Sequence, residues 1–206
     1  MPEADIHRLA VAATPRRYPR GQLLFYEGDT ADSLLVVVDG SLKAISTSPQ
    51  GEELLLAVLE PGETVGELTV ADGGPRSATI AALSDVTVLR LPREAVLAVA
   101  DHSPTLTRAL LASLASTVRR LTSDAADLVF LDVPRRVAKL LLGLPRTGGD
   151  DVVRTRMTQT ELAERVGASR QSLNAALQGF QRRGWLTVGA QEYRLRDVEA
   201  LRRFVG

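Results

Sequence analysis

The sequence predicts an α+β protein in which a β-rich N-terminal module, a long helix and a C-terminal helix-turn-helix follow one another along the chain. Three observations predict this class. Short apolar stretches separated by turn residues fill positions 17–91, apolar residues recur at heptad spacing between 105 and 130, and two capped helices flank a glycine at 167. Many short strands at such spacing are typical of a sandwich or barrel.

The expected strands are bounded by turn-forming residues, among them Glu27-Gly28-Asp29, Asp39-Gly40 and Pro61-Gly62. Glycine and aspartate tolerate the backbone conformations of turns, and proline ends regular hydrogen bonding. The strands bounded in this way are 23–26, 34–38, 42–45, 54–59, 78–83 and 86–91.

A long helix follows the strands. Pro92 opens a short helix that ends at Ala100, and Ser103 caps a longer one that runs from about Thr105 to Phe130. Its apolar residues are spaced 3, 4, 3, 4 and 3, which indicates a coiled-coil seam: Leu111, Leu114, Val118, Leu121, Ala125 and Leu128. A narrow seam favours a symmetric homodimer, and the alternative is packing on the barrel of the same chain.

The segment Asp132-Val133-Pro134 interrupts the long helix, and a short helix (135–142) and a glycine-containing loop (148–151) follow it. We therefore expect a β-rich domain over 1–103, a dimerisation helix and hinge over 104–131, and a DNA-binding domain over 132–206.

The C-terminal pattern predicts a winged helix-turn-helix. Thr158 and Glu161 form a capping box for a helix that ends at Val166, and Gly167 supplies the tight turn. Ser169 caps a second helix (170–182), and residues 185–195 predict a hairpin wing.

Charge and side-chain type connect this module to double-stranded DNA. Residues 1–130 hold 11 Lys/Arg and 17 Asp/Glu, a balance of −6, and residues 131–206 hold 14 and 8, a balance of +6. Arg170, Gln171 and Asn174 begin the second helix, and their side chains suit bidentate contacts with bases in the major groove. A small helical subdomain with an ordinary charged surface is the alternative.

Composition excludes several classes. The chain has no cysteine and two histidines, which excludes disulfides and iron–sulfur ligation and argues against haem or a histidine-rich metal site. No apolar run is long enough to span a membrane, so we expect a cytoplasmic protein without membrane partners. No P-loop or kinase motif is present, so an enzyme is not expected. A purely structural dimerisation protein would leave the basic module without a role.

Two short segments suggest a phosphate cradle. Gly66-Glu67-Leu68 starts a segment after a turn, and Arg76-Ser77-Ala78 follows Gly73-Gly74-Pro75. Free amides, an arginine and a serine hydroxyl suit a phosphate, and Glu67 suits a ribose hydroxyl. The alternative is an ordinary ion pair between Glu67 and Arg76.

In this order, the motifs resemble the cyclic AMP receptor protein/FNR (Crp/Fnr) superfamily of bacterial transcription regulators. The resemblance covers nearly the whole chain and rests on Pro19-Arg20-Gly21, Asp39-Gly40, the cassette from Gly66 to Thr79, Phe130-Leu131-Asp132-Val133 and Gly167-Ala168-Ser169-Arg170. It implies a jelly-roll-like cyclic nucleotide-binding β-roll, a dimerisation helix and a winged helix-turn-helix.

The resemblance also implies roles for particular residues. The ligand site would comprise Gly66, Glu67, Leu68, Arg76, Ser77 and Ala78, with Leu121 and Thr122 where relatives place hydroxyl residues that read adenine. Leu121 departs from that pattern because leucine cannot bond a base, whereas Thr122 can. Cyclic AMP is the leading ligand, with another cyclic nucleotide, another effector or no ligand as alternatives; in the last case the β-roll is only a dimer scaffold.

The second helix of the helix-turn-helix, which would read the DNA (the reading head), departs from the family at one position. Gln171 follows Arg170 where cyclic AMP receptor proteins usually have glutamate. We expect a changed base pair there, on a pseudo-palindromic operator. RNA polymerase is a further candidate partner. Phosphate contacts are expected from the remaining polar residues of this module: Thr158, Ser169, Ser172, Arg182, Arg183 and Arg194.

Overall fold

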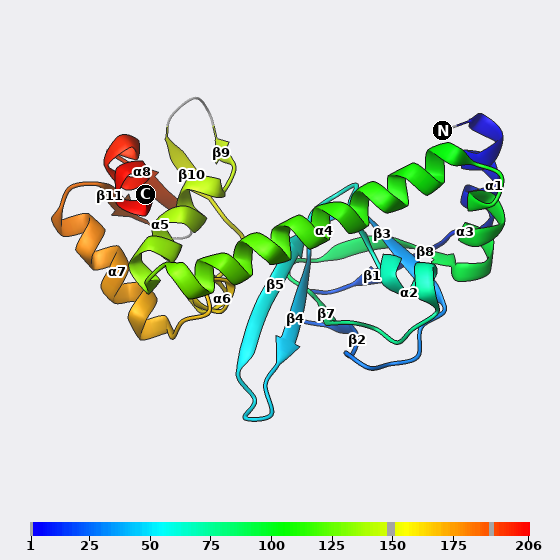
Figure 1. The fold of residues 1–206 in the computed structure, drawn as a ribbon, viewed down its shortest axis with the longest axis horizontal. Helices are drawn as coiled ribbons and strands as arrows, with labels where there is room; N and C mark the ends of the chain where they lie inside the picture. The colour runs from blue at the N-terminus through cyan, green and yellow to red at the C-terminus, as the bar shows by residue number, and fades with distance from the viewer. Residues whose placement is uncertain (1, 148–150, 190–191) are drawn as a thin grey trace. The chain divides into compact units, whose positions relative to one another are not determined.

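The computed structural model describes residues 2–147, 151–189 and 192–206, which form two compact units. One unit holds residues 56–121 with the chain up to Glu52, and the other holds Glu53–Leu55 with Thr122–Gly206. Helix α4 (Pro104–Phe130) contributes to both units (Figure 1). Of the residues predicted in loops, 148–150 and the wing residues 190 and 191 lie outside the described part.

Apart from residues Glu53–Leu55 of β5, which belong to the second unit, the first unit contains two antiparallel four-stranded sheets. Their strand orders are β1-β8-β3-β6 and β2-β7-β4-β5. Apolar residues from both sheets form one core, which includes Leu35, Val37, Leu42, Ile80 and Val88. The strands are β1 (Thr14–Tyr18), β2 (Leu23–Phe25), β3 (Ser33–Asp39), β4 (Leu42–Thr47), β5 (Glu53–Leu59), β6 (Thr64–Val65), β7 (Thr79–Ala82) and β8 (Val86–Pro92).

Three further helices belong to this unit: α1 (Glu3–Ala12), α2 (Glu67–Asp72) and α3 (Arg93–Ala100). A second apolar cluster, with Leu34, Val70, Leu91 and Val96 at its centre, receives Leu106 and Leu110 from α4. Helix α1 and strand β1 are not evident from the sequence. Most residues of β1 are exposed, so the strand lacks apolar alternation, and its pairing with β8 defines it instead.

Helix α4 begins as predicted, with Ser103 as its cap and proline in its first position. No residue of α4 is buried. The seam residues Leu111, Val118 and Leu121 are 60%, 62% and 42% exposed. These three residues therefore do not pack on the barrel of the same chain, which was the alternative to a dimer seam.

The second unit combines a helix-turn-helix with a four-stranded sheet of order β11-β12-β10-β9, and α7 packs against β11. Its core includes Val137, Leu141, Leu162, Leu173 and Phe180. The elements are α5 (Val133–Gly143), β9 (Arg146–Thr147), β10 (Val152–Arg154), α6 (Gln159–Arg165), α7 (Arg170–Arg182), β11 (Leu186–Val188), β12 (Glu192–Leu195) and α8 (Val198–Val205).

Helix α8 is not evident from the sequence either. Its apolar residues Val198 and Leu201 are one turn apart, and α8 packs along α5. Eight residues are too few to show a helical period clearly, and isolated helices of this length are marginal, so tertiary packing decides this element.

Within the second unit, ion pairs join the end of α4 to α5 and α6. Arg165 of α6 contacts Asp124 at 3.1 Å, and Lys139 of α5 contacts Asp127 at 2.6 Å. Asp132 caps α5 by accepting a hydrogen bond from the amide of Arg135 at 2.9 Å. The predicted interruption near residue 132 is thus a capped helix start immediately after α4.

Replacing Thr158 by alanine is expected to lower the free energy of unfolding by about 1 kcal/mol. Thr158 Oγ1 accepts from the amide of Glu161 at 3.2 Å, and Glu161 Oε2 accepts from the amide of Thr158 at 2.8 Å. The substitution breaks this capping box and leaves an amide without its partner. Chemical denaturation would measure the loss, with Thr160→Ala as the matched control. An equal loss in both variants would show that the cap contributes nothing.

Candidate nucleotide and DNA-binding sites

The first candidate site lies where β6 ends and α2 begins. Gly66 has a φ of 101° and caps α2. A Cβ atom at this position would lie 2.4 Å from Arg76 Nη1 and 2.9 Å from the Ser33 carbonyl oxygen. Both the backbone conformation and the close approach therefore require glycine. The structure brings Gly66 and Arg76 together as the sequence predicts.

Arg76 is a buried cation, only 6% exposed. Its Nη1 donates to the Ser33 carbonyl at 2.9 Å, its Nη2 donates to Ser33 Oγ at 3.2 Å, and its guanidinium stacks over Phe25 at 4.1 Å. Among the described residues it forms no ion pair. Loss of hydration on burial lowers the pKa of Arg76 from its ordinary value, but arginine remains protonated at neutral pH.

Asp32, an acidic residue whose charge favours the protonated form of Arg76, is hydrogen-bonded to another residue. Arg90 donates to both carboxylate oxygens of Asp32 at 2.7 Å, and this bond holds the pKa of Asp32 below its usual value. Arg76 therefore keeps a buried positive charge with only neutral hydrogen-bond partners. Such a charge is costly unless an anion compensates it, so the arrangement is suited to bind one.

Glu67 does not pair with Arg76. One of its carboxylate oxygens, Oε1, accepts hydrogen bonds from the hydroxyl of Thr64 and from Ser113 Oγ of α4, the latter at 2.9 Å. The predicted alternative of a surface ion pair between Glu67 and Arg76 is absent from the described contacts. Ser33, Thr64 and Ser113 could not be identified from the sequence, because only the folded chain brings them to the cassette.

The remaining residues of the cassette differ in their exposure. Leu68 and Ser77 are exposed and Ala78 is half-buried. The backbone of Arg76 is held by the amide of Gly28 and the carbonyl of Asp29, at 2.8 and 2.9 Å. Thr122 lies on the part of α4 that belongs to the second unit, so its role in a ligand site stays a prediction.

The second candidate site is built by the helix-turn-helix. The predicted capping box is present at Thr158, and Ser169 Oγ caps α7 by accepting from the amide of Ser172 at 3.1 Å. Gly167 has a φ of 60°, and a Cβ atom there would lie 3.0 Å from Leu128 of α4. Both the turn and this close packing favour glycine at the point that separates the two helices.

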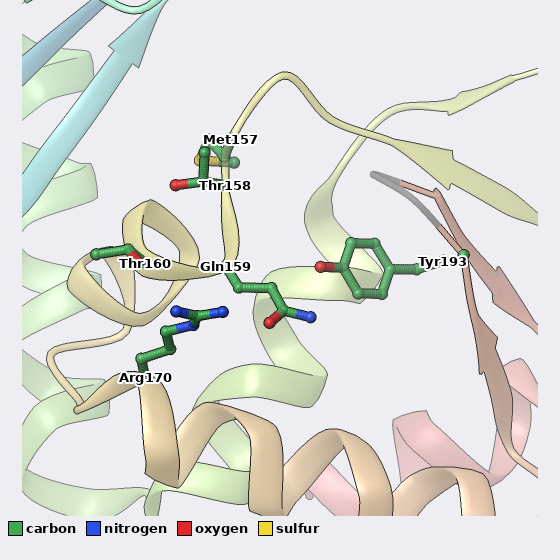
Figure 2. A pocket seen from close by; sticks show the side chains of 7 residues that line it. Met157, Thr158, Gln159, Thr160, Arg170 and Tyr193 are labelled. Atoms are coloured by element: carbon green, nitrogen blue, oxygen red, sulfur yellow. The ribbon is translucent and has the colours of Figure 1, made fainter.

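A cavity of about 450 Å³ opens where α6, α7 and β12 meet. Figure 2 shows Gln159 lying between Arg170, from the start of α7, and Tyr193 of β12. Burial raises the pKa of Tyr193, so the phenol stays protonated at neutral pH. Of the predicted DNA-binding residues, Thr158 and Arg170 line this cavity, whereas Gln159, Thr160 and Tyr193 were not predicted.

The other predicted DNA-binding residues are not among those that line the cavity. Gln171 and Ser172 are exposed and Asn174 is half-buried on the first turns of α7. Arg182 ends α7, and Arg183 stacks over Trp185 at 4.8 Å. The 13 residues of α7 span about 20 Å, so these two arginines lie a helix length from Arg170. Arg194, on the wing strand β12, contacts Glu192 at 3.6 Å.

Neither site involves clustered metal ligands. In the described ranges, no group of three or more histidine, aspartate or glutamate side chains is placed to hold a metal ion. None of the described helices is both long and apolar enough to cross a membrane.

Comparisons with known proteins match both parts of the chain. Residues 15–103 match the cyclic nucleotide-binding domain, and residues 135–204 match the Crp-like helix-turn-helix domain. The "CRP-like cAMP-activated global transcriptional regulator" of Mycobacterium tuberculosis is 37% identical over 194 residues, covering 92% of this chain and 87% of that protein. The "Cyclic AMP receptor protein" of Thermus thermophilus is 34% identical and covers 94% and 89%.

A solved structure has the same architecture. The c-di-GMP responsive global regulator CLP of Xanthomonas campestris superposes with a TM-score of 0.82 at 25% identity, covering 94% of this chain and 99% of that one. The predicted fold class and the resemblance are thereby confirmed. The chain belongs to the Crp/Fnr superfamily, whose members join a cyclic nucleotide-binding domain to a Crp-like helix-turn-helix, and it is a transcription regulator and not an enzyme.

Proposed function

We propose that this regulator is a homodimer that binds pseudo-palindromic DNA under the control of a cyclic nucleotide, with cyclic AMP as the first candidate. The main observation that supports nucleotide binding is the buried Arg76, which has no carboxylate partner among the described residues. Its guanidinium lies against Gly66, a position that no other residue could occupy. A cyclic phosphate would supply the missing anion, and the names of the two relatives above support cyclic AMP.

The exposed seam of α4 supports the dimer. Its large apolar residues would be covered by the same residues of a second copy, because a two-fold axis pairs one stripe with itself. Two helix-turn-helix units related by that axis would bind DNA half-sites about 34 Å apart. Such a protein would act in the cytoplasm, where bacterial DNA lies, and RNA polymerase remains a proposed partner.

Within each half-site, we assign base reading to Arg170 and Gln171. Arginine suits the two acceptors of guanine, and glutamine suits the donor and acceptor of adenine. Ser169 and Ser172 lie at the start of α7, and Thr158 lines the same cavity as Arg170, so their hydroxyls would contact phosphates. Asn174, on the next turn of α7, is a further candidate for base reading. Arg182 and Arg183 at the other end of α7, and Arg194 on β12, would add further phosphate contacts.

Coupling between ligand and DNA would follow the differential affinity of the nucleotide for two arrangements of the α4 pair. The hinge between Val129 and Pro134 would carry that difference to the reading head. The cap of Asp132 on α5 and the ion pairs of Asp124 and Asp127 make this end of α4 continuous with the DNA-binding unit.

One observation favours a second candidate, a regulator whose DNA binding does not depend on cyclic AMP. Leu121 stands on the exposed seam at 42% exposure, so it would stabilise the dimer without ligand while offering adenine no hydrogen bond. In this case the β-roll would be a dimer scaffold or would bind another effector. The responsiveness of the Xanthomonas relative to c-di-GMP illustrates such an effector.

Titration calorimetry with cyclic AMP, with 5′-AMP as the control ligand, tests the proposal together with fluorescence anisotropy on selected DNA. We expect a Kd of about 10 µM or tighter for cyclic AMP, at least roughly tenfold weaker binding of 5′-AMP, and tighter DNA binding with cyclic AMP. Sedimentation would report the oligomeric state. Specific DNA binding that cyclic AMP leaves unchanged would support the second candidate and overturn the first.

A further inference from the structure

Helix α4 presents two different faces in the first unit. The seam residues Leu111, Val118 and Leu121 are exposed, whereas Leu106 and Leu110 pack into the apolar cluster beneath α4. Ser113 lies three residues after Leu110, on this inward face, and is half-buried. The inward face therefore ends in a hydroxyl that can reach the nucleotide cassette.

The hydroxyl of Ser113 is bonded to the cassette carboxylate. Ser113 Oγ donates to Glu67 Oε1 at 2.9 Å, and the hydroxyl of Thr64 donates to the same oxygen. A carboxylate oxygen offers two lone pairs, so these two donors satisfy Oε1. Among the described residues, no donor bonds Glu67 Oε2, which leaves that oxygen for another partner.

We propose that Ser113 is a positioning residue for nucleotide binding: it holds Oε1 of Glu67 so that Oε2 accepts from the ribose 2′-hydroxyl. The inference rests on the proposed function, because it assigns a ribose to this carboxylate. It also links the ligand to α4 within one protomer, since one carboxylate would bond the nucleotide through one oxygen and the long helix through the other.

The donor to Glu67 is a neutral hydroxyl, and this affects how strongly the carboxylate can bind a ribose. A serine hydroxyl satisfies Oε1 without neutralising the carboxylate, so Oε2 keeps its full strength as an acceptor. Thr64 holds the same oxygen from β6, immediately before the cassette, so two elements fix the carboxylate. Without Ser113, Thr64 alone would hold Oε1, so the carboxylate would turn more freely about its Cγ–Cδ bond and the ribose hydroxyl would lose a fixed partner.

Titration calorimetry on the full-length protein, with cyclic AMP and 2′-deoxy cyclic AMP, tests the inference. Ser113→Ala is expected to weaken cyclic AMP about 3- to 10-fold and to leave the 2′-deoxy analogue within about twofold of wild type. Ser113→Thr, which keeps the hydroxyl, is expected to restore most of the preference for the ribose. Ser116→Ala on the exposed face of α4 is the matched control and should behave as wild type.

The outcomes separate the inference from the function on which it rests. A Ser113→Ala protein that weakens both ligands equally, or neither, overturns the positioning role while cyclic nucleotide binding stands. Wild-type protein that binds neither ligand overturns the proposed nucleotide function, and the role of Ser113 with it. A double-mutant cycle on unfolding, between Ser113→Ala and Glu67→Gln, would then show whether their hydrogen bond is only structural.

Discussion

Replacing Arg76 by glutamine is expected to weaken cyclic AMP binding by more than about a hundredfold and to change the free energy of unfolding by less than about 1 kcal/mol. The guanidinium, which is itself buried, would offer a cyclic phosphate two charge-assisted hydrogen bonds. Loss of its bonds to Ser33 would destabilise the fold, but removal of a buried charge without an anionic partner offsets that loss. Calorimetry and chemical denaturation would measure the two effects.

Arg17→Gln is the matched control for this result. Arg17 carries the same charge in the same unit, but it lies exposed on strand β1. Its loss is expected to change nucleotide affinity by no more than about threefold, through the weakened local positive potential. If the Arg76→Gln protein unfolds several kcal/mol more easily and still binds nucleotide, Arg76 is a structural residue and the proposed nucleotide site is wrong.

Local chemistry made much of the fold predictable from sequence. The capping box of Thr158 and the cap of Ser169 lie at the predicted positions because each is formed by residues three apart in the chain. The strands were located because turn residues with fixed backbone preferences separate apolar stretches. Strand β1 was not predicted, because its exposed residues carry no alternation and its identity comes from pairing with β8.

The candidate sites were predictable only in part, for the same reason. Gly66, Glu67 and Arg76 stand in a recognisable cassette, but the bonds of Arg76 with Ser33 span 43 residues and that of Glu67 with Ser113 spans 46. Only the folded chain specifies such contacts. Arg183 illustrates a different limit, because composition suggests a phosphate contact but cannot show that its guanidinium stacks over Trp185.

Replacing Arg170 by alanine is expected to lower affinity for the preferred DNA site about 10- to 100-fold and to relax selectivity at one base pair of each half-site. Arg170 is exposed at the capped start of α7, beside the cavity formed with α6 and β12. Its planar guanidinium would bond two acceptors of guanine, whereas alanine would bond neither. Selection from random DNA, followed by anisotropy with all four base pairs at that position, would measure both effects.

Arg182→Ala at the opposite end of α7 separates base reading from general attraction to DNA. Because Arg182 is assigned to a phosphate, its removal should weaken binding to all sequences similarly and reduce the salt dependence of binding by about one counterion. Arg170→Ala should instead reduce affinity mainly for the preferred base pair. If Arg170→Ala weakens every sequence equally, then Arg170 contacts the DNA backbone, and sequence reading has to be reassigned to Gln171 and Asn174, whose side chains favour adenine over guanine.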